Sequence, residues 1–281
     1  MRLEKDAGVT TMNKQQKATA LILAASRRGA ADSVAQIQNL SHKCLVVIDG
    51  MVMLERVVRE IQASENIERV FVSIENREIL KSVPALKTML EVGDIHYLPS
   101  ADNLFLSIQN AAKQIENPWP LVISTGDNAL HTSDMIDHFC IEIFSEPVDT
   151  AVAMTPSSVI LEAYPDGKRA FHELKGSGWS SCNLYAMMNQ KAVASAKIFE
   201  GGGQFGKRPR RIMAAFGLWF MILYKFKLAT IDNLANLLSR RWNMSLKVVR
   251  MPFADAPIDV DNPGDFERTE TILQARRAAA K

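Results

Sequence analysis

The chain alternates between short runs of consecutive apolar residues and segments in which apolar residues recur every three or four positions. The first apolar run covers residues 19–25, and the segment 52–61 carries Leu54, Val57 and Val58 at helical spacing. A short continuous run is typical of a strand buried on both faces, and the wider spacing is typical of an amphipathic helix. The sequence therefore opens with a predicted strand followed by a predicted helix.

The same alternation continues along the chain. Further strands are predicted at 69–74, 121–125, 150–154, 183–188 and 246–250, and further helices at 102–115, from Thr132 or Ser133 to 143, and at 265–276. We expect Asp102 to cap the first of these helices and Asp265 to cap the last. Glycines and small residues at 174–183 and 200–211 indicate loops, the second of which is basic and is a candidate lid. This rhythm predicts an α/β fold with three layers, in which helices cover both faces of a mainly parallel sheet.

Composition limits the possible functions. The 281 residues carry a net charge of only +2, which gives no electrostatic case for nucleic acid as a partner. Cys44, Cys140 and Cys182 lie far apart, so neither a zinc site nor a disulfide scaffold is expected. Residues 1–17 are polar and have no apolar signal segment, so we interpret them as a flexible leader and expect a cytoplasmic protein.

One apolar run, at 214–224, tests this interpretation. It has about half of the ~20 residues that a helix needs to span a bilayer, so no transmembrane segment is expected. We interpret it as a buried helix or strand. The alternative is a weak contact with a membrane or a partner, because Lys225 and Lys227 follow directly.

Asp127 is the most informative candidate for chemistry. It lies in a Gly-Asp-Asn turn directly after a predicted buried strand, where open α/β sheets place ligands. A carboxylate there suits a hard divalent cation, which prefers oxygen ligands. The alternative is that Asp127 caps the following helix.

A second acidic segment runs from Asp259 to Asp265. Asp259 and Asp261 share a face in an extended chain, so either is able to supply a second carboxylate to the same cation. A solvated acidic turn is the alternative. The five histidines show no metal-ligand spacing, and no serine lies in a nucleophile-elbow pattern.

Cationic residues follow the first predicted strand. Arg27 and Arg28 lie in the turn after it, where they are suited to clamp an anion, and Lys43 is able to reach a phosphate as a point charge. A second group lies in glycine-rich segments and is expected to form a cationic wall: Lys175, Lys207, Arg208, Arg210 and Arg211. For every one of these residues, simple solvation is the alternative.

Four segments together resemble a known family. They are 23–29 (LAASRRG), 43–54 (KCLVVIDGMVML), 124–130 (STGDNAL) and 259–266 (DVDNPGDF). In order and spacing they are similar to the motifs of nucleotidyltransferases with the glycosyltransferase-A-like fold, over residues 18 to 275. The MobA-like NTP transferases are the most similar group, including a subgroup labelled cobinamide-phosphate guanylyltransferase-like.

The resemblance implies a Rossmann-like nucleotide-diphospho-sugar transferase fold over 18–275. Residues 18–155 would bind the NTP, 156–258 would form the acceptor pocket and lid, and 259–275 would hold the metal motif and a closing helix. It also implies a reaction in which a phosphorylated small molecule attacks the α-phosphorus of an NTP and releases pyrophosphate, with Mg²⁺ as cofactor. CTP and GTP are the donors that the resemblance favours.

The same resemblance implies roles for individual residues. The nucleotide-binding residues would be Leu23, Ala24, Ala25, Ser26, Arg27, Arg28, Gly29, Lys43 and Asp127. Arg27 and Lys43 would be catalytic, neutralising phosphate charge, and Asp127 and Asp261 would hold the metal. The acceptor-binding residues would be Lys175, Asn183, Lys207 and Arg208.

The chain departs from the family pattern at Ser26, where the first loop usually has a glycine. This departure is the best support for one alternative, a non-catalytic nucleotide-binding or regulatory protein. A second alternative is a nucleotide-sugar-dependent glycosyltransferase. It is less favoured, because the turn at Asp127 lacks the usual Asp-x-Asp.

Overall fold

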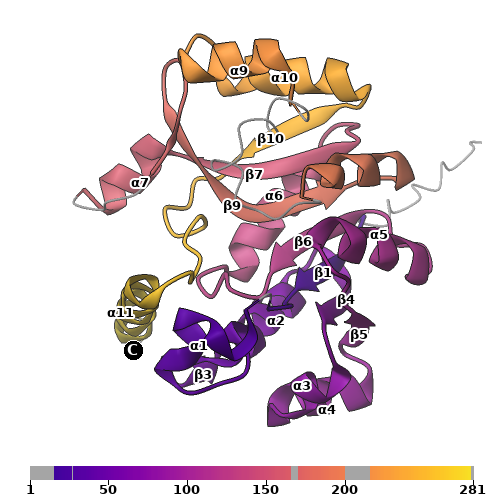
Figure 1. The fold of residues 1–281 in the computed structure, drawn as a ribbon, viewed down its shortest axis with the longest axis vertical. Helices are drawn as coiled ribbons and strands as arrows, with labels where there is room; N and C mark the ends of the chain where they lie inside the picture. Colours follow the sequence, from indigo (N-terminus) through magenta and orange to yellow (C-terminus); the bar gives the residue numbers. More distant parts are fainter. Residues whose placement is uncertain (1–15, 27, 166–169, 200–215, 280–281) are drawn as a thin grey trace, which may run out of the picture.

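The computed structural model describes residues 16–26, 28–165, 170–199 and 216–279 (Figure 1). The strands are β1 (Ala18–Leu23), β2 (Val47–Ile48), β3 (Met51–Val52), β4 (Ile67–Ile74), β5 (His96–Pro99), β6 (Leu121–Thr125), β7 (Thr150–Pro156), β8 (His172–Glu173), β9 (Gly178–Met187) and β10 (Leu246–Arg250). The α-helices are α1 (Ser33–Ile37), α2 (Met53–Ala63), α3 (Arg77–Lys81), α4 (Pro84–Val92), α5 (Leu104–Gln114), α6 (Ser133–Phe144), α7 (Ser157–Ala163), α9 (Leu218–Lys225), α10 (Ile231–Trp242) and α11 (Pro263–Ala279). Shorter 3-10 helices are η1 (Gly29–Ala31), η2 (Lys43–Leu45) and η3 (Gln190–Phe199).

The main sheet has the strand order β10-β7-β9-β6-β1-β4-β5, and β8 pairs with β9. It runs as a twisted ribbon from β10 near the top of Figure 1 to β5 near the bottom. β1 pairs in parallel with both β4 and β6, and β7 pairs in parallel with β10. β9 runs antiparallel between β6 and β7. The sheet is thus mixed but mostly parallel, which confirms the predicted α/β class.

Alternate residues of β1 face two separate cores. Ala20 and Ile22 belong to a cluster that includes the buried side chains of α6 and those of α2 from Leu54 onward. Leu21 belongs to a second cluster with buried side chains of α5 and η3. Because successive strand residues point to opposite faces, this division confirms that β1 is buried on both faces and that helices cover both sides of the sheet.

The strongest helix predictions are confirmed in detail. α2 buries Leu54, Val57 and Val58, as the spacing predicts. α6 begins after Thr132, whose side chain accepts a hydrogen bond from the Met135 N–H. α6 forms where the sequence predicts it because its apolar stripe and its polar cap agree on the same start. α2 begins after Val52, with no side-chain cap, so its apolar stripe alone accounts for the correct prediction.

Two predicted caps are wrong by a few positions. Asn103, not Asp102, caps α5, since its side chain accepts from the Leu106 N–H. At α11, the side chain of Asn262 accepts from the N–H groups of Gly264 and Asp265. Asp265 therefore lies inside the first turn of α11 rather than at its cap. An Asn and an Asp near a helix start are equivalent by propensity, and only the chain path decides between them.

The loop predicted at 174–183 is wrong from Gly178 onward, where β9 begins. Its first half, GWSSC, has one large side chain, Trp179, among glycine, serine and cysteine, so it lacks the run of large apolar residues that marks a strand. This half of β9 nevertheless forms a strand because it pairs with β7 at 179–181 and with β8 at 178–179. The predicted strand at 183–188 is the second half of β9. Several further elements have no counterpart among the predicted helices and strands: α1, α3, α4, α7, α10, β2, β3, β5 and β8.

The apolar run at 214–224 forms a helix from Leu218, as one interpretation predicts, but that helix is not buried. None of the residues of α9 falls in the buried class. Residues 214 and 215 lie outside the described part of the chain, as do 200–211 and the leader up to residue 15. Among the described residues, no helix has the length and the apolar content that crossing a membrane requires.

Asp137 on α6 fastens the turn between α2 and β4. Its Oδ1 accepts hydrogen bonds from the Ser64 hydroxyl (2.5 Å) and the Asn66 side-chain amide (2.7 Å). Partial burial by itself would raise the pKa of Asp137, but these hydrogen bonds and those from the backbone lower it below the ordinary value.

We expect Asp137→Ala to lower the free energy of unfolding at neutral pH by about 1–3 kcal/mol, because several hydrogen bonds to one carboxylate are lost. The folded-state pKa is depressed, so this stabilisation is present above the unfolded-state pKa of about 3.9 and is lost as the pH falls through the folded-state value. Urea unfolding from pH 7 down to pH 3 measures the effect. The exposed Asp134 of the same helix gives the control Asp134→Ala, and an equal loss in both variants would contradict the assignment.

Candidate active site

The loops after β1 and β6 are held together at the carboxyl ends of these two strands. Leu23 at the end of β1 is in register with Thr125 at the end of β6. The Gly126 N–H donates to the Leu23 carbonyl oxygen at 2.9 Å. A Cβ at Gly126 would lie 3.1 Å from the Ala24 Cβ and 3.2 Å from its Cα, so the close approach of the two loops requires a glycine.

Lys43 joins two carboxylates from distant parts of the chain. Its Nζ donates to Asp127 Oδ2 at 2.6 Å and to Asp261 Oδ1 at 2.8 Å. We call these three residues the acid–lysine cluster. A single cationic group lies within hydrogen-bond distance of both acids, so the two carboxylates lie within reach of one small cation.

Backbone contacts place each member of the cluster. Lys43 begins η2, and the buried Cys44 beside it belongs to the main core. The Val260 N–H donates to the Asp127 carbonyl oxygen at 3.1 Å, which brings the second acidic segment to the first. The Thr125 hydroxyl donates to Asp127 Oδ1 at 2.5 Å and fixes that carboxylate. The cluster is therefore built by the ends of the sheet rather than by loose surface loops.

The electrostatics of the cluster are dominated by the paired charges. Burial by itself would lower the pKa of Lys43, but the charges of Asp127 and Asp261 and the hydrogen bonds to them raise it above the ordinary lysine value. Lys43 thus carries its positive charge at neutral pH. The side chains of Lys43 and Asp127 are each 19% exposed and that of Asp261 is 66% exposed, so solvent and ligands reach the cluster from the Asp261 side.

The structure distinguishes between the alternatives that the sequence left open for the acidic residues. Thr132 caps α6, so Asp127 does not have that role. Asp261 contacts Lys43, whereas Asp259 accepts a hydrogen bond from the Asn183 side chain at 3.0 Å. Of the two acids that spacing could not distinguish, Asp261 is the one in the cluster.

The loop at 23–29 is closed by polar contacts. The Ser26 hydroxyl accepts from the Gly29 N–H at 3.0 Å. The Ser26 N–H donates to Glu75 Oε1 at 2.6 Å, and His42 Nε2 lies 3.4 Å from Glu75 Oε2. A backbone N–H of this loop therefore holds an anionic group in the structure. Arg27 lies outside the described residues.

Sequence reasoning missed Glu75. Its only signal is its place directly after β4, the strand that pairs with β1. The contact with Ser26 spans 49 positions of the chain, and no short motif joins the two residues. A carboxylate at the end of a neighbouring parallel strand is nevertheless a feature that a search of strand ends would find.

The predicted acceptor residues lie in different places. Asn183, on β9, donates to Asp259 and also to Asn128 Oδ1 at 3.4 Å, close to the turn of Asp127. Lys175 lies in the turn between β8 and β9, where its N–H donates to the Ala229 carbonyl oxygen. Lys207 and Arg208 lie outside the described residues, as do Arg210 and Arg211.

The residues of the acid–lysine cluster fit a magnesium ion whose coordination shell is completed by substrate oxygens and water. Within the described ranges, no group of three or more His, Cys, Asp or Glu side chains could enclose a metal. Mg²⁺ is commonly bound by one or two carboxylates together with substrate phosphates and water. Asp127 and Asp261 match this donor set in number and in chemistry.

The comparison with protein families decides the identity of the fold. Residues 20–198 match the model of the MobA-like NTP transferase domain. The chain belongs to the MobA-like NTP transferase family. It is therefore a nucleotidyltransferase, and the catalytic class predicted from the four motifs is confirmed at this level. No curated protein matches the sequence of the chain significantly.

Solved structures agree with this MobA-like fold. A structure described as a hypothetical transferase from Thermus thermophilus has a TM-score of 0.71 and 17% identity, over 89% of this chain and all of the other. A CMP:2-keto-3-deoxy-manno-octonic acid synthetase in complex with CTP has a TM-score of 0.58 and 10% identity, over 93% and 100%. A 4-diphosphocytidyl-2C-methyl-D-erythritol synthase from Anaerococcus prevotii has a TM-score of 0.55 and 12% identity, over 92% and 99%. At these identities the likeness concerns the fold alone.

We expect Gly126→Ala to destabilise this MobA-like domain by about 1–3 kcal/mol, because the new methyl group overlaps Ala24. Urea unfolding measures the loss. The double variant Ala24→Gly/Gly126→Ala removes the nearer of the two contacts and is expected to recover part of it. Strictly additive losses in the two single variants and the double variant would contradict the close approach.

Proposed function

We propose that this nucleotidyltransferase transfers a nucleoside monophosphate from an NTP to a phosphorylated small molecule, in a Mg²⁺-dependent reaction that releases pyrophosphate. The acid–lysine cluster is the observation that carries the proposal. It collects residues 84 and 218 positions apart at the edge of the sheet where α/β folds place ligands. A cluster assembled from such distant segments is better explained by a shared ligand than by local stability.

In this proposal Asp127 and Asp261 hold Mg²⁺. When bound, the ion would neutralise negative charge on the phosphates of the nucleotide. Lys43 lies between the same two carboxylates and contributes a fixed positive charge beside them. Its ammonium group is suited to contact a phosphate oxygen once the carboxylates have a second cation to share.

The chain's other residues bind and orient. The loop at 23–29 offers backbone N–H groups to the phosphates, and the Ser26 N–H already donates to a carboxylate at 2.6 Å. Arg27 and Arg28 clamp the phosphates, and Asn183, Lys175, Lys207 and Arg208 orient the acceptor. In the reaction an oxygen of the acceptor phosphate bonds to the α-phosphorus while the bond to the pyrophosphate oxygen breaks. Such transfers depend on positioning and charge neutralisation, with no protein nucleophile.

CTP is the first donor to test, with GTP next. The resemblance of the motifs favours these two, and two of the structures with a similar fold are named for cytidylyl chemistry, one of them in complex with CTP. A narrower likeness to the cobinamide-phosphate guanylyltransferase-like subgroup is the reason to include GTP. We place the reaction in the cytoplasm, where NTPs are abundant.

We expect Asp127→Ala to abolish turnover and the Mg²⁺-dependent binding of NTP while it leaves the fold intact, because one of the two metal carboxylates is lost. Thermal unfolding with CTP, GTP, UTP and ATP, each with and without Mg²⁺, measures the binding. A nucleotide at ~100 times its dissociation constant adds about 2.7 kcal/mol of stability. The exposed Asp134, also an aspartate near the start of α6, gives the matched control Asp134→Ala. Equal NTP affinity in Asp127→Ala and the wild type would overturn the metal assignment.

Lys43→Met tests the lysine independently of Asp127. The variant leaves two carboxylates facing each other without their shared cation. We therefore expect turnover to fall by about 100-fold, and stabilisation by MgCl₂ alone to become larger than in the wild type. Melting temperatures in a MgCl₂ series without nucleotide measure the second effect. If the variant shows the wild-type response to Mg²⁺ and unchanged turnover, Lys43 has no role in metal binding or in catalysis.

A further inference from the structure

Exposed apolar side chains gather in one short segment of the molecule. Nine large apolar residues of the described part of the chain are exposed, and four of them lie between 218 and 228. These four are Leu218 (63%), Trp219 (61%), Phe226 (62%) and Leu228 (58%). The other five are distributed over five different segments of the chain, so this concentration is a local property of α9 and the turn that follows it.

Exposed residues of α9 and its C-cap residue Phe226 form one continuous face together with the half-buried Ile222. Trp219, Ile222, Lys225 and Phe226 follow Leu218 by one, four, seven and eight positions, which places all five on the same side of a helix. We call these five residues the outer face of α9. The opposite side carries Phe220, Leu223 and Tyr224, which pack against a buried cluster that includes Met154 of β7 and Trp179 of β9. The helix thus packs one apolar face against the domain, where its side chains are partly buried, and presents a second face to solvent.

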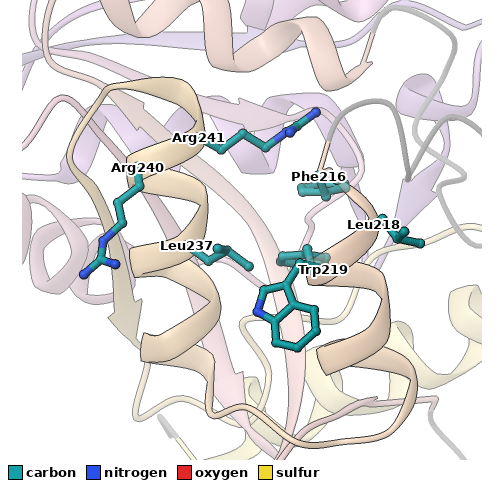
Figure 2. Close-up of a pocket in the computed structure, with 8 residues that line it drawn as sticks. Phe216, Leu218, Trp219, Leu237, Arg240 and Arg241 are labelled. Carbon is teal, nitrogen blue, oxygen red and sulfur yellow. The ribbon is translucent and has the colours of Figure 1, made fainter.

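A cleft of about 490 Å³ lies between α9 and α10 beside this face. Figure 2 shows Trp219 and Leu237 pointing toward each other across it, while Leu218 points away from it. Arg240 and Arg241, at the end of α10, line the same cleft. The cleft therefore combines an aromatic ring, apolar walls and cationic side chains.

The charge around the outer face is positive. Residues 216–229 contain two lysines, Lys225 and Lys227, and no acidic residue. The single acid of α10, Asp232, is paired with Arg250 at 2.5 Å. Glu173 lies 3.8 Å from Lys227 and offsets part of that charge. With the exposed Arg240 on the cleft, the balance on this side of the molecule favours an anionic partner.

We propose that the outer face of α9 docks onto the surface of an anionic phospholipid bilayer. Leu218, Trp219 and Phe226 enter the boundary between headgroups and acyl chains, and Lys225, Lys227 and Arg240 contact lipid phosphates. At eight residues, α9 is about 12 Å long, so it lies in the interface and does not cross it. Tryptophan with adjacent cations is the composition typical of such interfaces. The proposal does not depend on the reaction assigned to the acid–lysine cluster.

Vesicle binding by the full chain tests the proposal directly. The probes are vesicles of phosphatidylcholine alone and vesicles of roughly equal parts phosphatidylglycerol and phosphatidylcholine. We expect the protein to cosediment with the anionic vesicles. High salt is expected to weaken this binding, because it screens the electrostatic attraction. Trp219 is one of four tryptophans, and its emission is expected to shift to the blue on binding. Trp219→Phe is expected to lose that shift and to keep most of the binding.

Two variants separate the apolar and the cationic contributions. Trp219→Ser/Phe226→Ser is expected to weaken vesicle binding by about 10-fold or more, because the largest side chains that enter the lipid are removed. Lys225→Glu/Lys227→Glu is expected to abolish the preference for anionic lipid. Val92→Ser/Ile141→Ser removes two similarly exposed apolar residues elsewhere and is the matched control that keeps wild-type binding. All of these positions are exposed, so the fold is expected to persist.

Three results would each overturn the proposal: no cosedimentation of the wild type with anionic vesicles, equal binding to neutral vesicles, or unchanged binding by Trp219→Ser/Phe226→Ser. A fourth is a dimer in light scattering that this double variant dissociates, since a second copy of the chain would then cover the face. Nucleotide-dependent stabilisation, measured in the same variants, is expected to stay at the wild-type level. A failure of membrane docking is thereby distinguished from a failure of the proposed reaction.

Discussion

The attraction between one ammonium group and two carboxylates organises the edge of this sheet. Lys43 follows β1, Asp127 follows β6 and Asp261 follows β10. The three residues meet because the carboxyl ends of these strands lie at the same edge of the sheet. Two carboxylates placed this close repel each other unless a cation lies between them. In the structure Lys43 supplies this cation, while the Val260–Asp127 backbone hydrogen bond holds the two acidic segments together.

Much of the fold could be predicted from the sequence because burial and periodicity agree. β1 and α2 were predictable from an apolar run and an apolar stripe, and the structure buries both as expected. β9 was not predictable from Gly178 to Cys182, because a single Trp179 among small residues gives no strand pattern, and the segment is defined by the neighbours that pair with it. The exposure of α9 could not be predicted either, since a helix that is apolar on all sides gives no indication of which side packs against the core.

The candidate site shows the same division. The position of Asp127 after a buried strand was readable, and so was the presence of two further acids near the end of the chain. Which of those acids faces Lys43 was not, because that choice depends on how the fully buried Val260 orients the segment between them. The contribution of Glu75 to the site could not be predicted for a related reason. Its partner is a backbone N–H 49 residues away, and a backbone group leaves no mark on the sequence.

Asp261 lies in a segment that follows every strand of the sheet and directly precedes α11. During synthesis, the sheet and the loop at 23–29 can therefore assemble while the second carboxylate is still inside the ribosome. A chain that stops or is cut before this segment keeps most of its core and still lacks half of its acidic pair. The contact between residues 43 and 261 therefore forms after the sheet, and in the proposed mechanism a shortened product with a folded sheet would lack one of its two metal carboxylates.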